Sequence, residues 1–309
     1  MRILGAAAFL PLILLVPSQS EAQTPADAKP ADAKPGDAKA TDAKTGAAKP
    51  DPKKFTKGPV GKAPAPCGAT VLPLVEGNHW TYGFVVSPNP PREDLVKLLP
   101  TQPSTVEITV KSVQTQGPDT VITLEEKTSA DLSKDPKKHI MDDRTLTTTV
   151  TCNRTKFEIS PDSFFFAGEP GGYYGLKFDD FKRPKDTTLK LVNGNIGEAE
   201  WREDIVAHFT RTGVEGSGAK LDGGKLELER KFSPAQPERL NTKAGLYTAE
   251  HLFLTTTGRV TLDHPQPDSK PSELPAGWVN QLWLVPNVGV VQALNAYGHM
   301  YMLTDAQLK

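Results

Sequence analysis

Beyond residue 67 the sequence alternates apolar and polar residues with a period of two, and this alternation constrains the fold more than any other feature. Side chains of a β-strand point alternately to opposite faces, so the period predicts strands with one buried face. The strictest example is KLELERKF at 225–232, which places Leu226, Leu228, Arg230 and Phe232 on one face. Further stretches of the same kind are 104–113, 144–152, 204–212, 246–256, 278–286, 289–298 and 299–303.

Clusters of Gly, Pro and Asp separate these stretches, as turns between strands require. Helical periodicity is confined to one short segment at 92–100, which Pro100 ends. About 240 residues with roughly a dozen strands suffice for one barrel or sandwich. The sequence therefore predicts an all-β domain with a short helix over 67–309.

The domain opens with LPLVEGNHWTYGF at 72–84. Gly77 and Asn78 are residues that turns favour, and they predict a turn that leads the chain into a strand. Trp80 and Tyr82 then share one strand face, where the rings are buried and each polar atom finds a partner.

The first 22 residues have the pattern of a secretory signal peptide. Arg2 precedes an apolar core, and small residues at Ser20 and Ala22 predict cleavage before Gln23. A membrane anchor is the alternative, but the apolar run is shorter than the ~20 residues that a spanning helix needs. We therefore expect a periplasmic or secreted protein that does not span the membrane after signal removal.

Residues 23–66 form a linker rich in Ala, Lys, Asp and Pro, with a repeat of five residues. The repeat has no large apolar side chain to bury, and its prolines interrupt helix. The sequence predicts a disordered, low-complexity spacer. Weak adhesion of its lysines to an anionic envelope polymer is an alternative, which the interleaved Asp residues oppose.

The two cysteines, Cys67 and Cys152, predict a disulfide because an even count in an exported chain favours pairing. The bridge would tie the start of the domain to its body and contribute roughly 4–5 kcal/mol in the chain-entropy model. Two separate buried thiols are the alternative.

Charge is distributed unevenly along the chain. Residues 24–66 carry nine Lys and five Asp, a net charge of +4, whereas residues 67–309 carry 26 Lys and Arg against 31 Asp and Glu, a net charge of −5. A net-acidic domain is a poor match for phosphate backbones, so no nucleic-acid partner is expected.

Four stretches, at 72–84, 193–201, 242–252 and 282–292, resemble in order a group of uncharacterised secreted bacterial β-domain proteins. The first carries the pattern Pro-Leu, then Gly-Asn, then Trp-x-Tyr, and the last is similar to a closing strand pair. The resemblance implies a single antiparallel barrel-like or half-barrel domain. It implies no activity.

The stretch SFFFAGEPGGYYGLKFDDF at 163–181 holds seven of the 22 aromatic residues. Ordinary core strands around a hairpin at GEPGG are one interpretation. However, three successive Phe cannot share one face of a strand, so some must be covered by another element, a ligand or a partner. The candidate ligand-binding residues are Phe164, Phe165, Phe166, Tyr173, Tyr174 and Phe178.

No catalytic or metal motif is present in the sequence. The six His residues form no zinc-binding spacing, and His139 and His264, which lie near aspartates, are expected to be solvated loop residues. The paired Asp179 and Asp180 point to opposite faces of a strand, so they make no acid–base pair. We expect no cofactor, no metal and no enzyme activity, although a site assembled from distant residues would leave no local signature.

Two functions remain. One is an exported, envelope-associated binding or structural module that contacts an unknown envelope component. The alternative is a carrier that holds an apolar small molecule, such as a lipid, in a β-barrel cavity walled by the aromatic stretch. The interior of a barrel of this size can equally be filled by side chains.

Overall fold

The computed structural model describes residues 56–87, 102–133, 137, 139–169, 176–185, 196, 199–211, 223–263 and 273–309. The predicted signal peptide, the linker up to residue 55, the helix expected at 92–100, and Tyr173 and Tyr174 lie outside the described residues. The boundaries after residue 22, between signal peptide and linker, and after residue 66, between linker and β-domain, stay predictions.

Within these described residues, thirteen strands form one antiparallel sheet, which confirms the predicted fold class. The strands are β1 (His79–Val85), β2 (Thr105–Gln116), β3 (Asp119–Asp131), β4 (Met141–Cys152), β5 (Phe157–Ile159), β6 (Leu176–Lys185), β7 (Trp201–Arg211), β8 (Gly224–Pro234), β9 (Glu238–Thr242), β10 (Gly245–Leu262), β11 (Glu273–Val285), β12 (Gly289–Leu294) and β13 (Met300–Gln307). Their order is β5-β4-β3-β2-β1-β13-β12-β11-β10-β8-β7-β6, with β9 beside β10, so the sheet is not closed.

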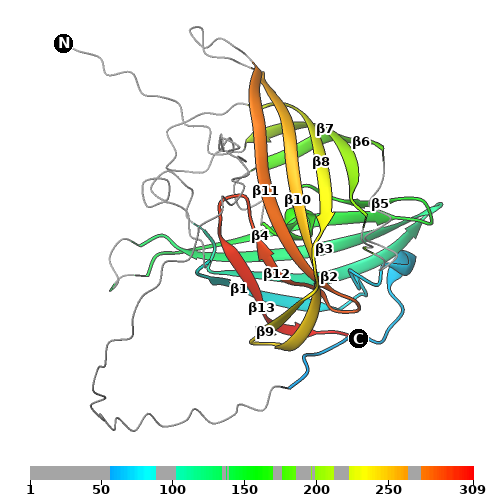
Figure 1. Ribbon diagram of the computed structural model, residues 1–309, viewed down its shortest axis with the longest axis vertical. Helices are drawn as coiled ribbons and strands as arrows, with labels where there is room; N and C mark the ends of the chain where they lie inside the picture. Colours follow the sequence, from blue (N-terminus) through cyan, green and yellow to red (C-terminus); the bar gives the residue numbers. More distant parts are fainter. Residues whose placement is uncertain are drawn as a thin grey trace, which may run out of the picture.

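The sheet is strongly curved. In Figure 1, β6, β7, β8, β10 and β11 stand upright, whereas β2, β3 and β4 run across below them. The terminal strands β1 and β13 pair with each other in the middle of the sheet, so the chain closes on itself there. Its concave face holds the core and the short helix α2 (Phe164–Ala167).

Burial follows the alternation along the predicted strands. In β8, Leu226, Leu228, Arg230 and Phe232 are all buried, as predicted. In β2 the same holds for every second residue from Val106 to Val110. The long strand β10 departs from a single period, because His251 and Leu252 are adjacent and both buried. At this point the strand changes both its buried face and its neighbour, since β9 pairs with residues 245–249 and β8 with residues 252–262.

The opening strand has the predicted arrangement. Gly77 adopts a positive φ of 85°, and Trp80 and Tyr82 on one face of β1 are fully buried. Trp80 donates its indole N–H to the carbonyl of Val288 at 2.6 Å, and the Tyr82 hydroxyl donates to that of Val290 at 2.9 Å. Both polar atoms therefore find the partners expected of them.

The C-terminal end of the predicted linker contacts the domain. Lys57 bridges to Leu246, and the amide of Lys62 donates to the carbonyl of Lys309 at 2.6 Å. The amide of Gly61 donates to the carbonyl of Asn287 at 2.8 Å. These contacts bring the start of the described chain beside its C-terminus.

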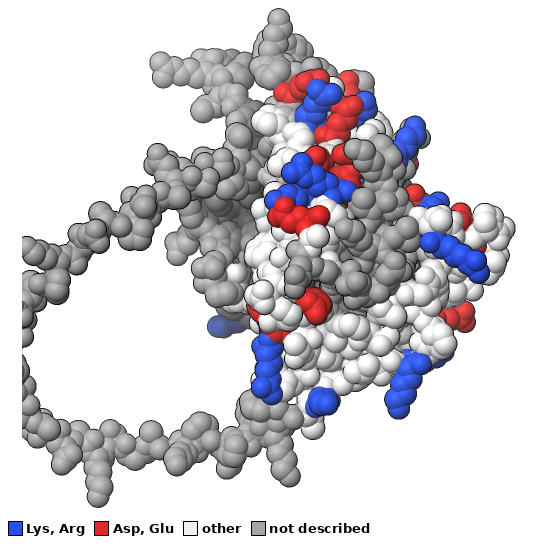
Figure 2. Space-filling model, turned by 45° about the vertical axis from the view of Figure 1, so that its right-hand side comes forward, with Lys and Arg blue, Asp and Glu red and all other residues white. Residues whose placement is uncertain are grey.

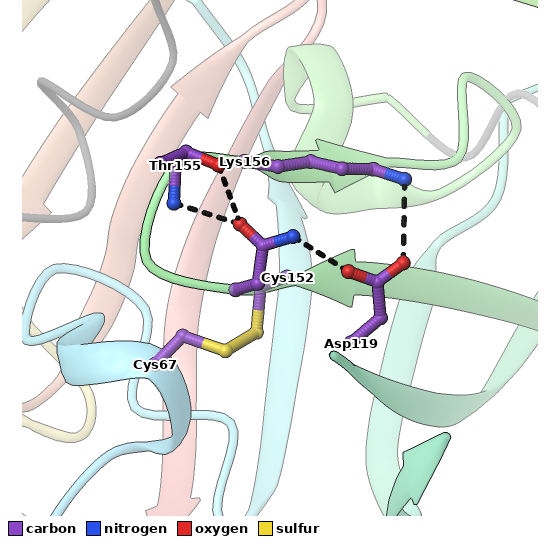
Figure 3. The surroundings of a disulfide bond; sticks show 6 residues. Cys67, Asp119, Cys152, Thr155 and Lys156 are labelled. Carbon is purple, nitrogen blue, oxygen red and sulfur yellow. Dashed lines mark hydrogen bonds and ion pairs between the residues drawn. A yellow bond between two sulfur atoms is a disulfide. The ribbon is translucent and has the colours of Figure 1, made fainter. Parts of the chain in front are cut away.

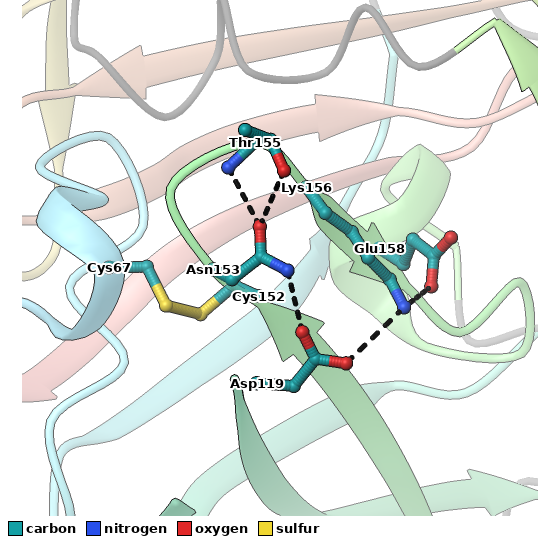
Figure 4. A network of polar contacts seen from close by, with 7 residues as sticks. All are labelled: Cys67, Asp119, Cys152, Asn153, Thr155, Lys156 and Glu158. Carbon is teal, nitrogen blue, oxygen red and sulfur yellow. Dashed lines mark hydrogen bonds and ion pairs between the residues drawn. A yellow bond between two sulfur atoms is a disulfide. The ribbon is translucent and has the colours of Figure 1, made fainter. Parts of the chain in front are cut away.

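The structure confirms the disulfide between Cys67 and Cys152, whose Cα atoms are 6.1 Å apart. It joins a single 3-10 turn at Pro66–Gly68 to the end of β4 (Figure 3). A polar network adjoins it (Figure 4), in which the side-chain amide of Asn153 donates to Asp119 at 2.6 Å and its oxygen accepts from the amide of Thr155. The bridge is consistent with an extracytoplasmic location.

Candidate functional site

The run of three phenylalanines forms a helical turn, α2, on the concave face of the sheet. Ser163 caps its N-terminus by accepting a hydrogen bond from the amide of Phe165, and Gly168 ends it in the left-handed region with φ of 73°. Serine before a helix and glycine after it are the residues that such ends favour. The interpretation of residues 164–166 as strand is therefore wrong, because a helical turn lets successive rings point in different directions.

Two of the rings fill the core. Phe164 packs against Tyr82 with ring centroids 4.5 Å apart and against Tyr301 at 5.9 Å. Phe165 meets Trp80 edge to face at 5.3 Å. Both phenylalanines are buried, so α2 packs against the aromatic side chains of β1 and β13 on the concave face of the sheet.

The third ring, Phe166, lies beneath a buried guanidinium. Arg230 on β8 stands 4.0 Å from the centroid of this ring and donates to the carbonyl of Phe166 at 3.0 Å. It also pairs with Glu203 on β7, with 2.5 Å between Nε and Oε1. Because a buried charge is costly unless it is paired and hydrogen-bonded, this set of contacts is what allows Arg230 to face the core.

Glu126 on β3 anchors the start of α2. Its carboxyl accepts from the Ser163 hydroxyl at 2.5 Å, from the amide of Phe164 at 2.9 Å and from the Thr148 hydroxyl at 2.8 Å. Burial raises the pKa of Glu126 to about 7 despite these three donors, and the nearby Asp162 raises it further. The carboxyl therefore titrates near neutral pH.

A second buried carboxyl follows α2. Burial raises the pKa of Glu169 to about 7, although it accepts a hydrogen bond from the amide of Ala296. It follows directly on Gly168, where an added Cβ would lie 2.5 Å from the Cβ of Ala293 and 2.8 Å from Leu282. The chain after α2 thus approaches β11 and β12 closely enough to require glycine.

A small cavity lies between α2 and the sheet. Its volume is about 20 Å³, room for about one water molecule. Phe165, Phe166 and Arg230 line one side, and the apolar side chains of β10, β11 and β12 line the other. Cavities that bind small molecules usually have some hundreds of Å³.

The structure brings only part of the predicted aromatic set together. Phe164 and Phe165 lie in the main core. Phe166 and Phe178 of β6 both pack against a smaller cluster built on Ile205, Phe209, Leu226, Leu228, Val260 and Ala276. Tyr173 and Tyr174 lie outside the described residues.

Two charged residues of this site were missed at the level of the sequence. Arg230 and Glu126 each occupy a position that alternation assigns to an apolar face, beside Leu228 and Leu124 respectively. A charged residue on an otherwise apolar strand face could have indicated this site from the sequence, because a buried charge needs a buried partner. Its partners, Glu203 and Ser163, lie 27 and 37 residues away in the sequence.

The described histidines contact neighbouring side chains, and His264 lies outside the described residues. His208 lies 2.7 Å from Asp263, and His139 lies 2.8 Å from Asp131 and lowers the pKa of that carboxyl. His251 stacks on Trp283 at 4.2 Å and lies 2.8 Å from Glu238. Within the described ranges, no three His, Cys, Asp or Glu residues gather closely enough to hold a metal ion.

Charged side chains on the outer surface are mixed in sign. In Figure 2, positive and negative groups alternate over the upper part of the visible face. On β7, β8 and β10 they form ion pairs, among them Arg202 with Glu229 and Arg259 with Glu227. As for the membrane, none of the helices in the described part of the chain is long and apolar enough to cross it.

Large apolar side chains are exposed mainly at one end of the sheet. Gly83, Thr105, Ser129 and Asp143 form one row across β1 to β4. Five of the seven exposed large apolar residues in the described part of the chain lie within three residues of this row, and we call them the apolar rim: Phe84, Val86, Leu132, Ile140 and Met141.

No protein-family model matches the chain, and no curated protein matches it in sequence. Among solved structures, the chain is similar to a Parabacteroides distasonis protein named as a lipoprotein, with 13% identity and a TM-score of 0.44 over 77% of this chain and 99% of that one. It is also similar to a Bacteroides fragilis protein named as an exported protein with a YmcC-like fold, with 11% identity and a TM-score of 0.43 over 77% and 99% of the two chains. A third similar structure is the hypothetical lipoprotein YmcC of Escherichia coli, with 11% identity and a TM-score of 0.32 over 74% and 83%. Structural similarity to uncharacterised exported proteins and lipoproteins is what the resemblance in sequence leads us to expect, and none of the three names states a ligand or an activity.

Proposed function

We propose that this chain is a non-catalytic binding or structural module of the cell envelope, periplasmic or secreted, which acts through its outer surface. The observation that carries the proposal is the packing of α2. Phe164 and Phe165 are at most 2% exposed, and the cavity beside Phe165 has a volume of about 20 Å³. A carrier of an apolar ligand would need a far larger interior space.

The apolar rim is the surface that best suits a contact with an envelope component. Val86 is 75% exposed and Ile140 is 57% exposed, and both lie at the same end of the sheet. Large patches of exposed apolar side chains on a protein surface mark sites of contact with other molecules. The described end of the linker contacts the domain elsewhere, beside Lys309.

Native mass spectrometry of the protein purified from its own host separates the module from the carrier. We expect the mass of one or two copies of the processed chain with no bound lipid. We also expect the tryptophan fluorescence of the chain to stay constant when fatty acids are added, because Phe165 occupies the space beside the ring of Trp80. A stoichiometric bound lipid would overturn the proposal in favour of the carrier.

Envelope fractionation tests the contact surface. Replacing Val86 and Ile140 together by Ser should release the protein from the envelope fraction of its host into the soluble fraction. The matched control is Val279→Ser, since Val279 is 45% exposed on β11, outside the rim. Equal release of both variants, or of neither, would contradict a role for the rim.

A further inference from the structure

An open sheet has edges, and the edge strands differ in how they are protected. Natural proteins blunt exposed edges with short strands, prolines, irregularities or lysines, because unpaired backbone groups are a template for another strand. In β6 two irregularities interrupt the pairing with β7, and the strand contains Pro184. The outermost strand at the other end, β5, has only three residues.

β5 pairs only with the C-terminal end of β4. It pairs with Val150, Thr151 and Cys152, whereas β3 pairs with all of β4 from Met141 onward. In the part of the chain that the structure describes, no strand pairs with residues 141–148 on the side away from β3. This edge contains no Pro, Gly or Lys.

Two hydrogen bonds establish which backbone groups face outward. The carbonyl of Ile140 accepts from Leu132, so the even-numbered residues of this strand direct their backbone groups toward β3. The carbonyl of Thr149 accepts from Ser160, so the odd-numbered residues direct theirs away from β3. Backbone groups therefore point outward at Met141, Asp143, Thr145 and Thr147.

We propose that this edge of β4 pairs antiparallel with the same edge of a second copy of the chain, about a two-fold axis at Thr145. An extended strand is the partner that outward backbone donors and acceptors fit. The segment is also complementary to itself, because a two-fold axis here places Thr145 opposite Thr145 and Asp143 opposite Thr147, and leaves out Thr149, whose carbonyl accepts from Ser160.

Charge supports this register. No two like charges lie opposite each other, since Asp142 faces Thr148 and Arg144 faces Leu146 of the second copy. Arg144 pairs with Asp142 of its own strand, with 2.8 Å between Nη2 and Oδ2, which balances the charges along the edge. Registers centred on Asp143 or Arg144 would place like charges opposite each other, which destabilises strand pairs.

Proline substitution tests the pairing without breaking the native ladder. Thr145→Pro removes an outward N–H, and the bonds between β4 and β3 do not use this group. Sedimentation equilibrium of the exported chain should give a dimer for the wild type and for Thr145→Ala, which keeps the N–H. In Thr145→Pro, loss of the two bonds between the central threonines should weaken the dimer about thirtyfold.

Hydrogen exchange gives a second measurement that needs no variant. The amides of Asp143, Thr145 and Thr147 should exchange slowly at high protein concentration and faster on dilution, whereas those of β3 should not change. A monomeric wild type overturns the proposal, as does a Thr145→Pro variant that dimerises like Thr145→Ala. Exchange of these three amides that does not depend on protein concentration would also overturn it. This measurement uses the wild type, so it decides the question even if Thr145→Pro does not fold.

Discussion

The most informative single residues are the charged groups that face the core. Arg230 is held by Glu203, by the carbonyl of Phe166 and by the Phe166 ring, so its charge is fully accommodated in the interior. Glu126 differs, because its three partners are uncharged donors and a negative charge there receives no opposite charge in return. This difference makes Glu126, like Glu169 at the other end of α2, a group through which pH acts on the helical turn.

Glu126→Gln should therefore reduce the pH dependence of stability. Folding raises the pKa of Glu126 from 4.5 to about 7, so its stabilising contribution is fully present below about pH 4.5 and is lost as pH rises through 7. Between about pH 5 and about pH 8, the wild type should lose roughly 2 kcal/mol more of its free energy of unfolding than Glu126→Gln does. Urea unfolding at the two pH values measures the difference.

The neighbouring residue supplies the control for this prediction. Glu125 faces outward, where Lys111 and Lys127 lower its pKa below 4.5. Its stabilising contribution is present above pH 4.5 and is lost only as pH falls through its folded pKa. Glu125→Gln should leave the change between about pH 5 and about pH 8 as in the wild type. An unaltered slope in Glu126→Gln would show that its carboxyl does not titrate in this range.

Among the elements, α2 depends most on its surroundings. A helix of four residues is not stable alone in water, because nucleation is unfavourable. Glu126 and Ser163 bind its first backbone amides, and Gly168 lets the chain leave across β11 and β12. The helical turn therefore forms only in the folded sheet, where Glu126 of β3 binds its N-terminus and β11 and β12 pack against its C-terminal end.

Gly168→Ala should destabilise the domain more than a comparable substitution elsewhere. The new Cβ would meet Ala293 and Leu282 as well as a left-handed backbone, for a total cost of roughly 2–4 kcal/mol. Gly117→Ala is the matched control, since Gly117 has a φ of 62° and no neighbouring atom within 4 Å. We expect about 1 kcal/mol there. Thermal unfolding compares the two, and equal losses would mean that the close approach of Gly168 costs nothing.

For the molecule as a whole, the disulfide is the covalent tie between the start of the domain and β4. It encloses a sequence separation of 85 residues. Reduction should lower the free energy of unfolding by roughly 4 kcal/mol in the chain-entropy model, measured by urea unfolding with and without reductant. The double variant Cys67→Ser, Cys152→Ser should match the reduced protein and ignore the reductant. If reduction leaves the unfolding midpoint unchanged, the bridge does not stabilise the fold.

Local patterns in the sequence are sufficient for most of the strands and for the pairing of the two cysteines, whereas β3, β5 and β9 were not predicted. Alternation reports on nearest neighbours alone, which is why Leu226 to Phe232 could be assigned to one buried face without knowledge of any partner strand. The same holds for Trp80 and Tyr82 after their turn.

The tertiary structure alone decides the order of the sheet, its curvature and the conformation of the three phenylalanines. Their helical turn is capped by a carboxyl 37 residues away, and Tyr82 and Tyr301, against which Phe164 packs, lie on the first and last strands. Such contacts leave no trace in local periodicity, because each depends on chain segments that meet only after the sheet has formed.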